Sequence, residues 1–286
     1  MLVLGGSSSR SLAGNLATSL GAPLCRSESR RFPDDELYVR ILDDVKGEDV
    51  VLVQSTYPDA RLLELLLWQD AARESGAKSV TTVIPYYGYG RQDKRFLEGE
   101  PVSARALARC IQTSTDGVVA VDLHNTSILG HFDVPARHVT GMAPLGGYLK
   151  ENGVEVVLAP DKGALERAKK VASIVGCEWD HLEKKRIDSN TVEMKPKSLE
   201  VKGLSVAIVD DIISTGGTVV AASGFLRASN AKRITAACTH GLFVGNALEK
   251  LKKCCDEVVS TDTIEGPSSR VSVADEVASA VRSLLK

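Results

Sequence analysis

The chain has 286 residues, of which 43% are hydrophobic and 25% charged, and this composition excludes a disordered protein. At about 150 residues per domain, its length predicts two domains. The formal net charge of −2 argues against a broad basic surface for nucleic acid, and no apolar run is long enough to span a membrane. The six cysteines lack metal-ligand spacing, which predicts reduced thiols in a cytoplasmic protein.

Apolar strands alternate with helices along the first half of the chain. Residues Met1–Gly6 lack the basic region and the long apolar core of a signal peptide, and so predict a first strand. Further strands are expected at Val50–Val53 and Val80–Ile84, with a leucine-rich helix at Leu62–Glu74 between them. This helix is apolar over a wide arc, which predicts packing on more than its own sheet.

Two charged segments of the first half could bind a nucleotide. Residues Arg31–Glu36 contain Phe32, whose ring can stack on a base, and three carboxylates that can accept hydrogen bonds. Residues Tyr86–Arg95 place three cations within the five residues 91–95, which suits a triphosphate. Taken alone, the first segment is equally an acidic turn and the second a solvated charged loop.

A third candidate follows the apolar strand Val118–Val121. The strand leads into Asp122-Leu123-His124, which places His124 where parallel sheets bind their ligands, at the carboxyl end of a strand. A lone histidine is more often structural, but its position after a buried strand favours a functional role.

The second half of the chain repeats the first. The alanine and glycine pattern Ala13, Ala17 and Gly21 recurs as Ala168, Ala172 and Gly176, and strand Val50–Val53 recurs as Val206–Val209. Two copies of one α/β unit are therefore expected, meeting near residue 145, which gives domains 1–145 and 146–286. Strands that are apolar throughout, with no alternation of apolar and polar residues, predict mainly parallel sheets flanked by helices. The last segment, 271–286, has apolar residues at helical spacing and could dock on the first domain.

The most specific pattern is Leu204–Thr218, a buried strand followed by an acidic pair, a glycine loop and a helix. Asp210 and Asp211 can accept hydrogen bonds from vicinal hydroxyls or approach a metal, and 214–218 offers N–H groups and hydroxyls to a phosphate. Gly216 and Gly217 allow a close backbone approach. A ligand with a diol at one end and a phosphate at the other would fit these groups, and ribose 5-phosphate is such a ligand. The matching loop of the first copy, Gln54–Asp59, has neither acidic pair nor glycines.

This string resembles the phosphoribosyl diphosphate (PRPP) motif shared by type I phosphoribosyltransferases and ribose-phosphate pyrophosphokinases. Other segments favour the pyrophosphokinases. Residues Arg91–Lys94 are similar to their R-Q-D-K loop, Phe32–Glu36 to their F-x-D-x-E segment, and Ala159–Ala164 to their S-P-D-x-G-G loop. Lys184-Lys185-Arg186 resembles the K-x-R that opens their mobile catalytic loop, here expected at 187–202. The short chain resembles the compact archaeal members of that family.

The resemblance implies two duplicated type I phosphoribosyltransferase-like domains, the first binding ATP and the second ribose 5-phosphate. It implies transfer of the β,γ-diphosphoryl group of ATP to the 1-hydroxyl of ribose 5-phosphate, giving PRPP and AMP, in a homo-oligomer of at least two chains. For ATP, the resemblance assigns Phe32, Asp34, Asp35, Glu36, Arg91, Gln92, Asp93 and Lys94. For ribose 5-phosphate, it assigns Arg186, Asp210, Asp211, Ser214, Thr215, Gly216, Gly217 and Thr218. It assigns Lys184 and Arg186 to catalysis, and His124 and Asp161 to Mg²⁺.

Two other functions remain open at this stage. A type I phosphoribosyltransferase would consume PRPP together with a nucleobase, and a non-catalytic regulatory protein associated with PRPP synthase would keep the fold without the reaction. A dinucleotide-dependent oxidoreductase is disfavoured, because Gly5–Ser9 does not have the G-x-G-x-x-G spacing.

Overall fold

The computed structural model describes residues 1–186, 192–196 and 200–285, and of 183–186 and 192–196 it describes the backbone alone. Contacts divide the chain into two units. The first comprises Met1–Thr140, Asp262–Glu265 and Ser272–Lys286, and the second Gly141–Thr261 and Gly266–Val271. The boundary expected near residue 145 falls inside helix α4 (Met142–Glu151), which belongs to the second unit because Leu145 and its neighbours are buried in that unit's core.

The first unit is built on a five-stranded sheet of order β1-β4-β5-β6-β7, in which every neighbouring pair is parallel. The strands are β1 (Leu2–Gly5), β4 (Asp49–Val53), β5 (Ser79–Ile84), β6 (Gly117–Val121) and β7 (Ala136–Val139). Strands β2 (Ser27–Arg31) and β3 (Leu37–Ile41) form a separate antiparallel hairpin. The helices are α1 (Arg10–Leu20), α2 (Ala60–Glu74), α3 (Ser103–Ile111) and α8 (Ala274–Leu284), with short 3₁₀ turns η1 (Gln112–Ser114) and η2 (Thr126–His131).

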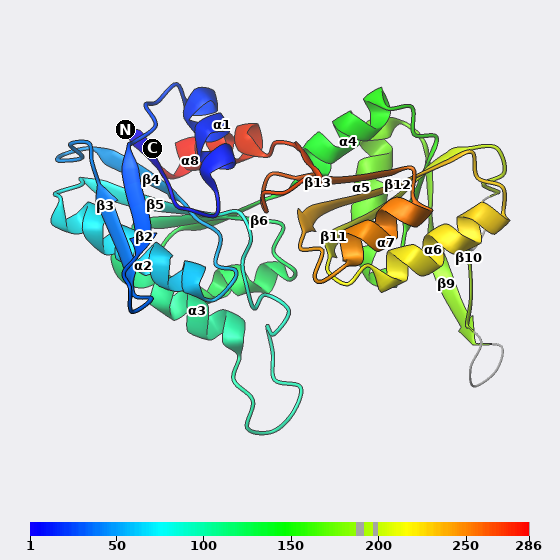
Figure 1. Cartoon of the computed structure of the whole chain (residues 1–286), viewed down its shortest axis with the longest axis horizontal. Helices are drawn as coiled ribbons and strands as arrows, with labels where there is room; N and C mark the ends of the chain where they lie inside the picture. The colour runs from blue at the N-terminus through cyan, green and yellow to red at the C-terminus, as the bar shows by residue number, and fades with distance from the viewer. Residues whose placement is uncertain (187–191, 197–199, 286) are drawn as a thin grey trace. The chain divides into compact units, whose positions relative to one another are not determined.

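Helices cover both faces of this sheet because its strands are apolar on both sides. Residues Leu4 and Leu52 pack with α2 and α3, whereas the alternating Val3 and Val51 pack on the other face with α1 and α8. Helices α1 and α8 come from opposite ends of the chain and lie side by side (Figure 1). Val277 of α8 is fully buried, so the C-terminal segment completes the core of the first unit.

The leucine-rich helix α2 buries a mixed face. Leu65 and Trp68 are buried, and so are Glu64 and Gln69, while Leu63 is 52% exposed. Besides β4 and β5, the helix contacts β3 of the separate hairpin, in agreement with its wide apolar arc.

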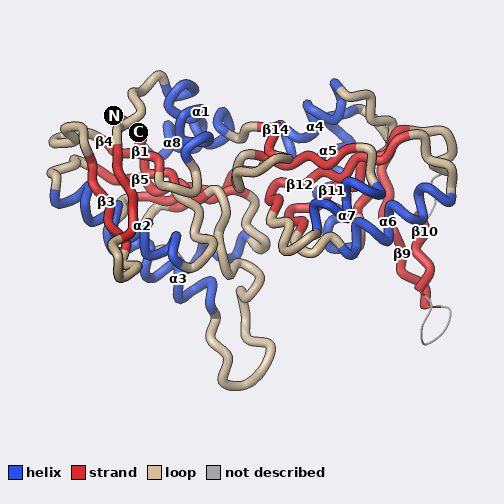
Figure 2. The backbone as a smooth tube through the Cα atoms, viewed as in Figure 1, coloured by secondary structure: helices blue, strands red, loops and turns tan. Residues whose placement is uncertain are grey.

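The second unit is built on a seven-stranded sheet of order β10-β9-β8-β11-β12-β13-β14, parallel except between β9 and β10. Figure 2 shows its helices on both sides of the strands. The strands are β8 (Val156–Ala159), β9 (Glu178–Arg186), β10 (Val192–Pro196), β11 (Ser205–Ile213), β12 (Arg233–Gly241), β13 (Glu257–Thr261) and β14 (Ser269–Val271). The helices are α4, α5 (Leu165–Val175), α6 (Gly217–Ala228) and α7 (Ala247–Cys254), with a 3₁₀ turn η3 (Lys162–Ala164).

The strand orders confirm the predicted duplication. Strand β4 lies between β1 and β5 in the first unit, and β11 lies between β8 and β12 in the second. The loops that follow β4 and β11 therefore occupy equivalent places at the carboxyl ends of their sheets. None of the helices in the described ranges combines the length and the apolarity that a membrane crossing needs.

Candidate active site

The acidic pair lies within β11 rather than after it. The strand continues to Ile213, since Asp210 is paired with Cys238 and Ile213 with Gly241 of β12. The sequence predicted that the strand ends at the carboxylates, and this was wrong because the hydrogen-bonded ladder to β12 extends beyond them. The loop bearing the glycines begins only at Ser214.

Asp210 and Asp211 differ in their surroundings. Asp211 is 4% exposed, and its Oδ2 accepts a hydrogen bond from Nη2 of Arg167 at 2.9 Å. Burial and the adjoining Asp211 carboxyl raise the pKa of Asp210 to about 8. The pair therefore combines one carboxyl that is hydrogen-bonded to a guanidinium with one whose pKa is raised.

The glycine loop opens the twelve-residue helix α6. Gly216 is the residue preceding the helix, with φ of 73°, a left-handed conformation that favours glycine, and a Cβ there would lie 3.3 Å from the Leu251 side chain. Gly217 has open space around it. The first turn of a helix has N–H groups without intrahelical acceptors, so the loop and the start of α6 can hold a phosphate.

Asp161 follows β8, the strand next to β11, and so lies at the same edge of the sheet. Its Oδ1 accepts hydrogen bonds from the N–H groups of Gly163 at 2.8 Å and Ala164 at 3.3 Å. Arg167 connects this loop to the acidic pair, because its Nη1 donates to the carbonyl oxygen of Gly163 at 3.1 Å. The sequence analysis missed Arg167, which lies in an ordinary charged helix and whose partner is 44 residues away.

Lys184 and Arg186 both lie in β9, and their backbones pair with Met194 and Val192 of β10. Their side chains are outside the described part of the chain, so their predicted catalytic role is untested. The segment 187–202 was expected to be a mobile loop or flap. Within it, Val192–Pro196 forms β10 through backbone pairing with β9, while 187–191 and 197–199 lie outside the described residues.

In the first unit, the R-Q-D-K loop follows β5. Arg91 and Lys94 are exposed and can reach a phosphate. Gln92 is held by its side-chain oxygen, which accepts a hydrogen bond from the Ser103 hydroxyl at the start of α3. Asp93 accepts a hydrogen bond from Asn125 Nδ2 at 2.6 Å.

The Asp93–Asn125 contact joins the R-Q-D-K loop to the segment that contains His124. His124 is exposed and follows β6, the strand next to β5. The structure thus brings two of the predicted motifs together, because the carboxyl ends of neighbouring parallel strands meet at one edge of the sheet.

The F-x-D-x-E residues form the turn of the β2–β3 hairpin, and all of them are exposed. The Phe32 ring is 5.5 Å from the Tyr38 ring, and the Arg30 guanidinium lies 4.8 Å from the Phe32 centroid. A surface hollow of about 490 Å³ separates this turn from α2. In the part of the chain that the structure describes, no hydrogen bond or ion pair joins residues 32–36 to residues 91–94.

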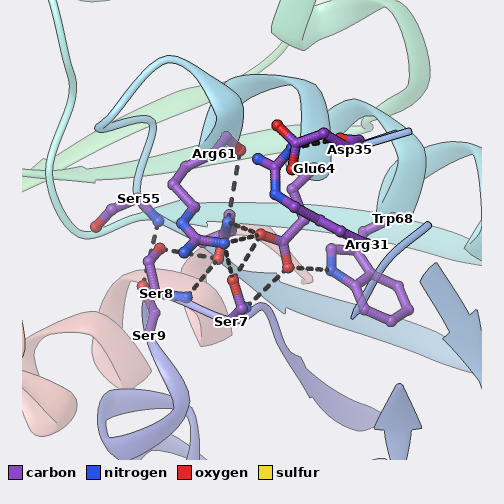
Figure 3. A network of polar contacts seen from close by, with 10 residues as sticks. Ser7, Ser8, Ser9, Arg31, Asp35, Ser55, Arg61, Glu64 and Trp68 are labelled. Carbon is purple, nitrogen blue, oxygen red and sulfur yellow. Dashed lines mark hydrogen bonds and ion pairs between the residues drawn. The ribbon is translucent and has the colours of Figure 1, made fainter. Parts of the chain in front are cut away.

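A buried polar network lies behind β4 and was not anticipated from the sequence (Figure 3). The Glu64 carboxylate, fully buried, accepts hydrogen bonds from Ser7, Arg61, Gln54 and Trp68. Burial by itself raises the pKa of Glu64, but the hydrogen bonds from Ser7 and Arg61 outweigh it and lower the pKa below its usual range. A buried carboxylate at Glu64 was not expected from the sequence, because this residue lies in a leucine-rich run.

Among the described residues, no three His, Cys, Asp or Glu side chains gather as a metal site. A Mg²⁺ ion bound through one or two side chains, with phosphates and water completing its shell, does not require such a cluster.

Comparisons with known proteins agree with this geometry. Residues 1–114 match the family model for the N-terminal domain of ribose phosphate pyrophosphokinase, and residues 146–275 match the phosphoribosyl transferase domain. The chain is 46% identical to the ribose-phosphate pyrophosphokinase of Methanopyrus kandleri over 99% of both chains, and 44% identical to that of Pyrococcus furiosus over 97% of this chain and 99% of the relative. The crystal structure of phosphoribosylpyrophosphate synthetase from Mycobacterium smegmatis superposes with a TM-score of 0.84 at 31% identity, covering 99% of this chain and 98% of that one.

Proposed function

The chain belongs to the ribose-phosphate pyrophosphokinase family, and we infer from this membership that it transfers the β,γ-diphosphoryl group of ATP to ribose 5-phosphate. The 1-hydroxyl oxygen of the sugar bonds to the β-phosphorus, the bond from that phosphorus to the α,β-bridging oxygen breaks, AMP leaves, and the hydroxyl proton is released. This conclusion rests on the similarity to ribose-phosphate pyrophosphokinases over nearly the full length of the chain.

The ribose 5-phosphate site is proposed at the carboxyl end of β11. Asp210 and Asp211 would accept hydrogen bonds from the ribose hydroxyls, and Ser214–Thr218 would bind the 5-phosphate at the start of α6. The left-handed Gly216 and the helix N-terminus, at which the Gly216 position supplies no side-chain cap, support this placement. Arg167 would orient the Asp211 carboxyl for the sugar through its hydrogen bond.

ATP would bind in the first unit, with Arg91, Gln92, Asp93 and Lys94 on its phosphates and ribose. The exposure of the two cations and the fixed side chain of Gln92 support this. Phe32, Asp34, Asp35 and Glu36 are proposed to contact the adenine of a neighbouring chain, since they lie on a hairpin without a described bond to 91–94. The enzyme would then be a homo-oligomer, at least a dimer.

Lys184 and Arg186 are proposed to stabilise the negative charge that develops on the transferring group, because phosphoryl transfer depends on positioning and charge neutralisation rather than on a protein nucleophile. His124 in the first unit and Asp161 in the second are each proposed to bind Mg²⁺. A single side chain leaves most of an ion's coordination shell to phosphates and water, which suits Mg²⁺. When bound, Mg²⁺ neutralises phosphate charge.

The enzyme is proposed to work in the cytoplasm. All six cysteines are free thiols, as expected in a reducing compartment. The two alternative functions are weaker. The N-terminal pyrophosphokinase domain disfavours a phosphoribosyltransferase, and the presence of Lys184, Arg186, His124 and Asp161 disfavours a non-catalytic regulator.

One assay separates these functions. The purified protein is incubated with ATP, ribose 5-phosphate and MgCl₂ without a nucleobase, and AMP and PRPP are measured. Equimolar AMP and PRPP would establish the pyrophosphokinase reaction. A second incubation contains PRPP, MgCl₂ and a nucleobase, and PRPP consumption that requires the nucleobase would instead indicate a phosphoribosyltransferase. Activity in neither incubation would indicate a regulator.

A further inference from the structure

The loop Gln54–Asp59 takes the place in the first unit that the ribose 5-phosphate loop has in the second. It follows β4 as the glycine loop follows β11, yet it has no acidic pair and the proposed reaction uses none of its residues. Its first three side chains are nevertheless almost inaccessible, with Gln54, Ser55 and Thr56 exposed by 0%, 3% and 1%. Buried polar side chains of this kind have specific partners.

The partners on one side belong to the loop after β5. Tyr86 N donates to Ser55 Oγ at 3.1 Å, and Gly88 N donates to Thr56 Oγ1 at 2.8 Å. Thr56 N in turn donates to the Tyr86 carbonyl oxygen at 3.1 Å. The loops approach so closely that a Cβ on Gly88 would lie 2.8 Å from the Thr56 carbonyl oxygen. The two hydroxyls therefore fix the backbone from Tyr86 to Gly88.

The fixed backbone leads directly into the R-Q-D-K loop. Tyr89 donates from its hydroxyl to Asp59 Oδ1 at 2.8 Å, so the far end of the β4 loop holds the next residue as well. Gln92 N then donates to the Tyr89 carbonyl oxygen at 3.0 Å. The residues that precede Arg91 are thus tied one after another to the loop that follows β4.

On its other side, the β4 loop rests on the buried Glu64 network (Figure 3). Ser55 N donates to Ser9 Oγ at 3.2 Å, Ser8 Oγ donates to Gln54 Oε1 at 2.9 Å, and Gln54 Nε2 donates to Glu64 Oε2 at 3.1 Å. The start of the loop is therefore held between the Glu64 network and the loop that follows β5.

We propose that Ser55 and Thr56 are positioning residues for ATP, whose hydroxyls set the backbone of Tyr86–Gly88 and through it the place of Arg91. This role rests on the proposed function, in which residues 91–94 bind ATP. Without the Thr56 hydroxyl, the buried Gly88 N–H loses its acceptor, and a buried unpaired donor is costly enough that the loop must shift.

The test compares three threonine variants in the full-length enzyme. Thr56→Val removes the hydroxyl at nearly constant volume, Thr56→Ser keeps it, and Thr82→Val is the matched control. Thr82 is equally buried, on β5, and its hydroxyl bonds to Thr115 at 2.9 Å rather than to the loop. Steady-state kinetics, Tm and amide exchange of Gly88 are measured for each.

We expect Thr56→Val to raise KM for ATP about tenfold, the effect of one lost hydrogen bond, with KM for ribose 5-phosphate unchanged and faster exchange of the Gly88 amide. Thr56→Ser should keep KM for ATP and the exchange rate of the Gly88 amide near their wild-type values. Thr82→Val should lower Tm without raising KM for ATP. A Thr56→Val enzyme with the ATP kinetics of Thr82→Val would overturn the proposal.

Two further variants complete the test. If Thr56→Val does not fold, the exposed Tyr89→Phe decides instead. A higher KM for ATP supports the positioning role, and an unchanged KM refutes it. Arg91→Ala distinguishes a failure of the proposed ATP site from a failure of the positioning role. If Arg91→Ala leaves KM for ATP unchanged, the R-Q-D-K loop does not bind ATP and the proposed function of this site fails. If Arg91→Ala raises KM for ATP but Thr56→Val does not, the positioning role alone is refuted.

Discussion

Arg167 and Asp211 form a hydrogen-bonded ion pair, with Nη2 donating to Oδ2 at 2.9 Å, and the same guanidinium donates to the carbonyl oxygen of Gly163. Helix α5 thereby ties the loop that contains Asp161 to the acidic pair of β11. The Asp211 side chain is only 6% exposed, so the Arg167 guanidinium compensates a charge that is largely shielded from water.

Replacement of Arg167 by alanine should lower kcat/KM for ribose 5-phosphate by about 10- to 100-fold, the range for losing a hydrogen bond to a charged group. Arg167→Lys should recover only part of the loss, since an ammonium group cannot donate in the geometry of the guanidinium fork. Arg227→Ala, which breaks the more exposed pair with Asp256, is the control and should leave the kinetics unchanged. Equal kinetics for the Arg167 and Arg227 variants would exclude the role of Arg167.

The raised pKa of Asp210 predicts that stability depends on pH. Its ordinary value is about 3.9, and in the folded chain it is about 8, so between these values the folded chain binds a proton that the unfolded chain releases. Stability from this group is therefore present at low pH and lost as pH rises toward 8. Urea unfolding at a series of pH values should show this decline, and Asp210→Asn should flatten it. An equal slope in the variant would refute the assignment.

The same carboxyl predicts proton release on substrate binding. Hydroxyls of the sugar donate best to an ionised carboxylate, so binding of ribose 5-phosphate below pH 8 should expel the Asp210 proton. Calorimetric titration in two buffers of different ionisation enthalpy measures the protons released. We expect a fractional release in the wild type and none in Asp210→Asn. The idea fails if both proteins release the same number.

Gly216 and Gly217 should respond differently to alanine. Gly216→Ala forces a side chain into a left-handed conformation beside Leu251, which should destabilise the protein by about 1–2 kcal/mol and weaken binding of the 5-phosphate. Gly217→Ala has room for its methyl group and should keep the wild-type Tm. Thermal unfolding and KM for ribose 5-phosphate check this, and a similar loss of Tm in both variants would contradict the backbone argument.

The buried Glu64 should be important for stability rather than for catalysis. Glu64→Gln removes the charge opposite Arg61 and places an amide donor where donors from four residues converge, which should lower the free energy of unfolding by about 2–4 kcal/mol. Glu28→Gln breaks the exposed ion pair with Arg30 and should change the free energy of unfolding by less than about 0.5 kcal/mol. Denaturant unfolding compares the two, and a loss below 1 kcal/mol for Glu64→Gln, by the same scale, would be too small for a buried ion pair.

The amino-acid sequence by itself determined the α/β class, the duplication and the motifs at the strand ends. Strands such as Val50–Val53 and Val206–Val209 are apolar without interruption, and such a pattern is local enough to be recognised in isolation. The acidic pair, the glycine loop and the R-Q-D-K loop are likewise contiguous, and their places after predicted strands put them at the carboxyl edges of the sheets.

Only the tertiary structure decided which distant residues complete these sites. Arg167 of helix α5 pairs with a carboxylate of strand β11, Glu64 is buried within a leucine-rich helix, and Thr56 holds the backbone of Gly88. The extension of β11 past its acidic pair also depends on a neighbour, since it is the ladder to β12 that continues. Hydrogen bonds between residues far apart in the chain leave no periodic trace in the sequence, and they become visible only when the fold brings donor and acceptor together.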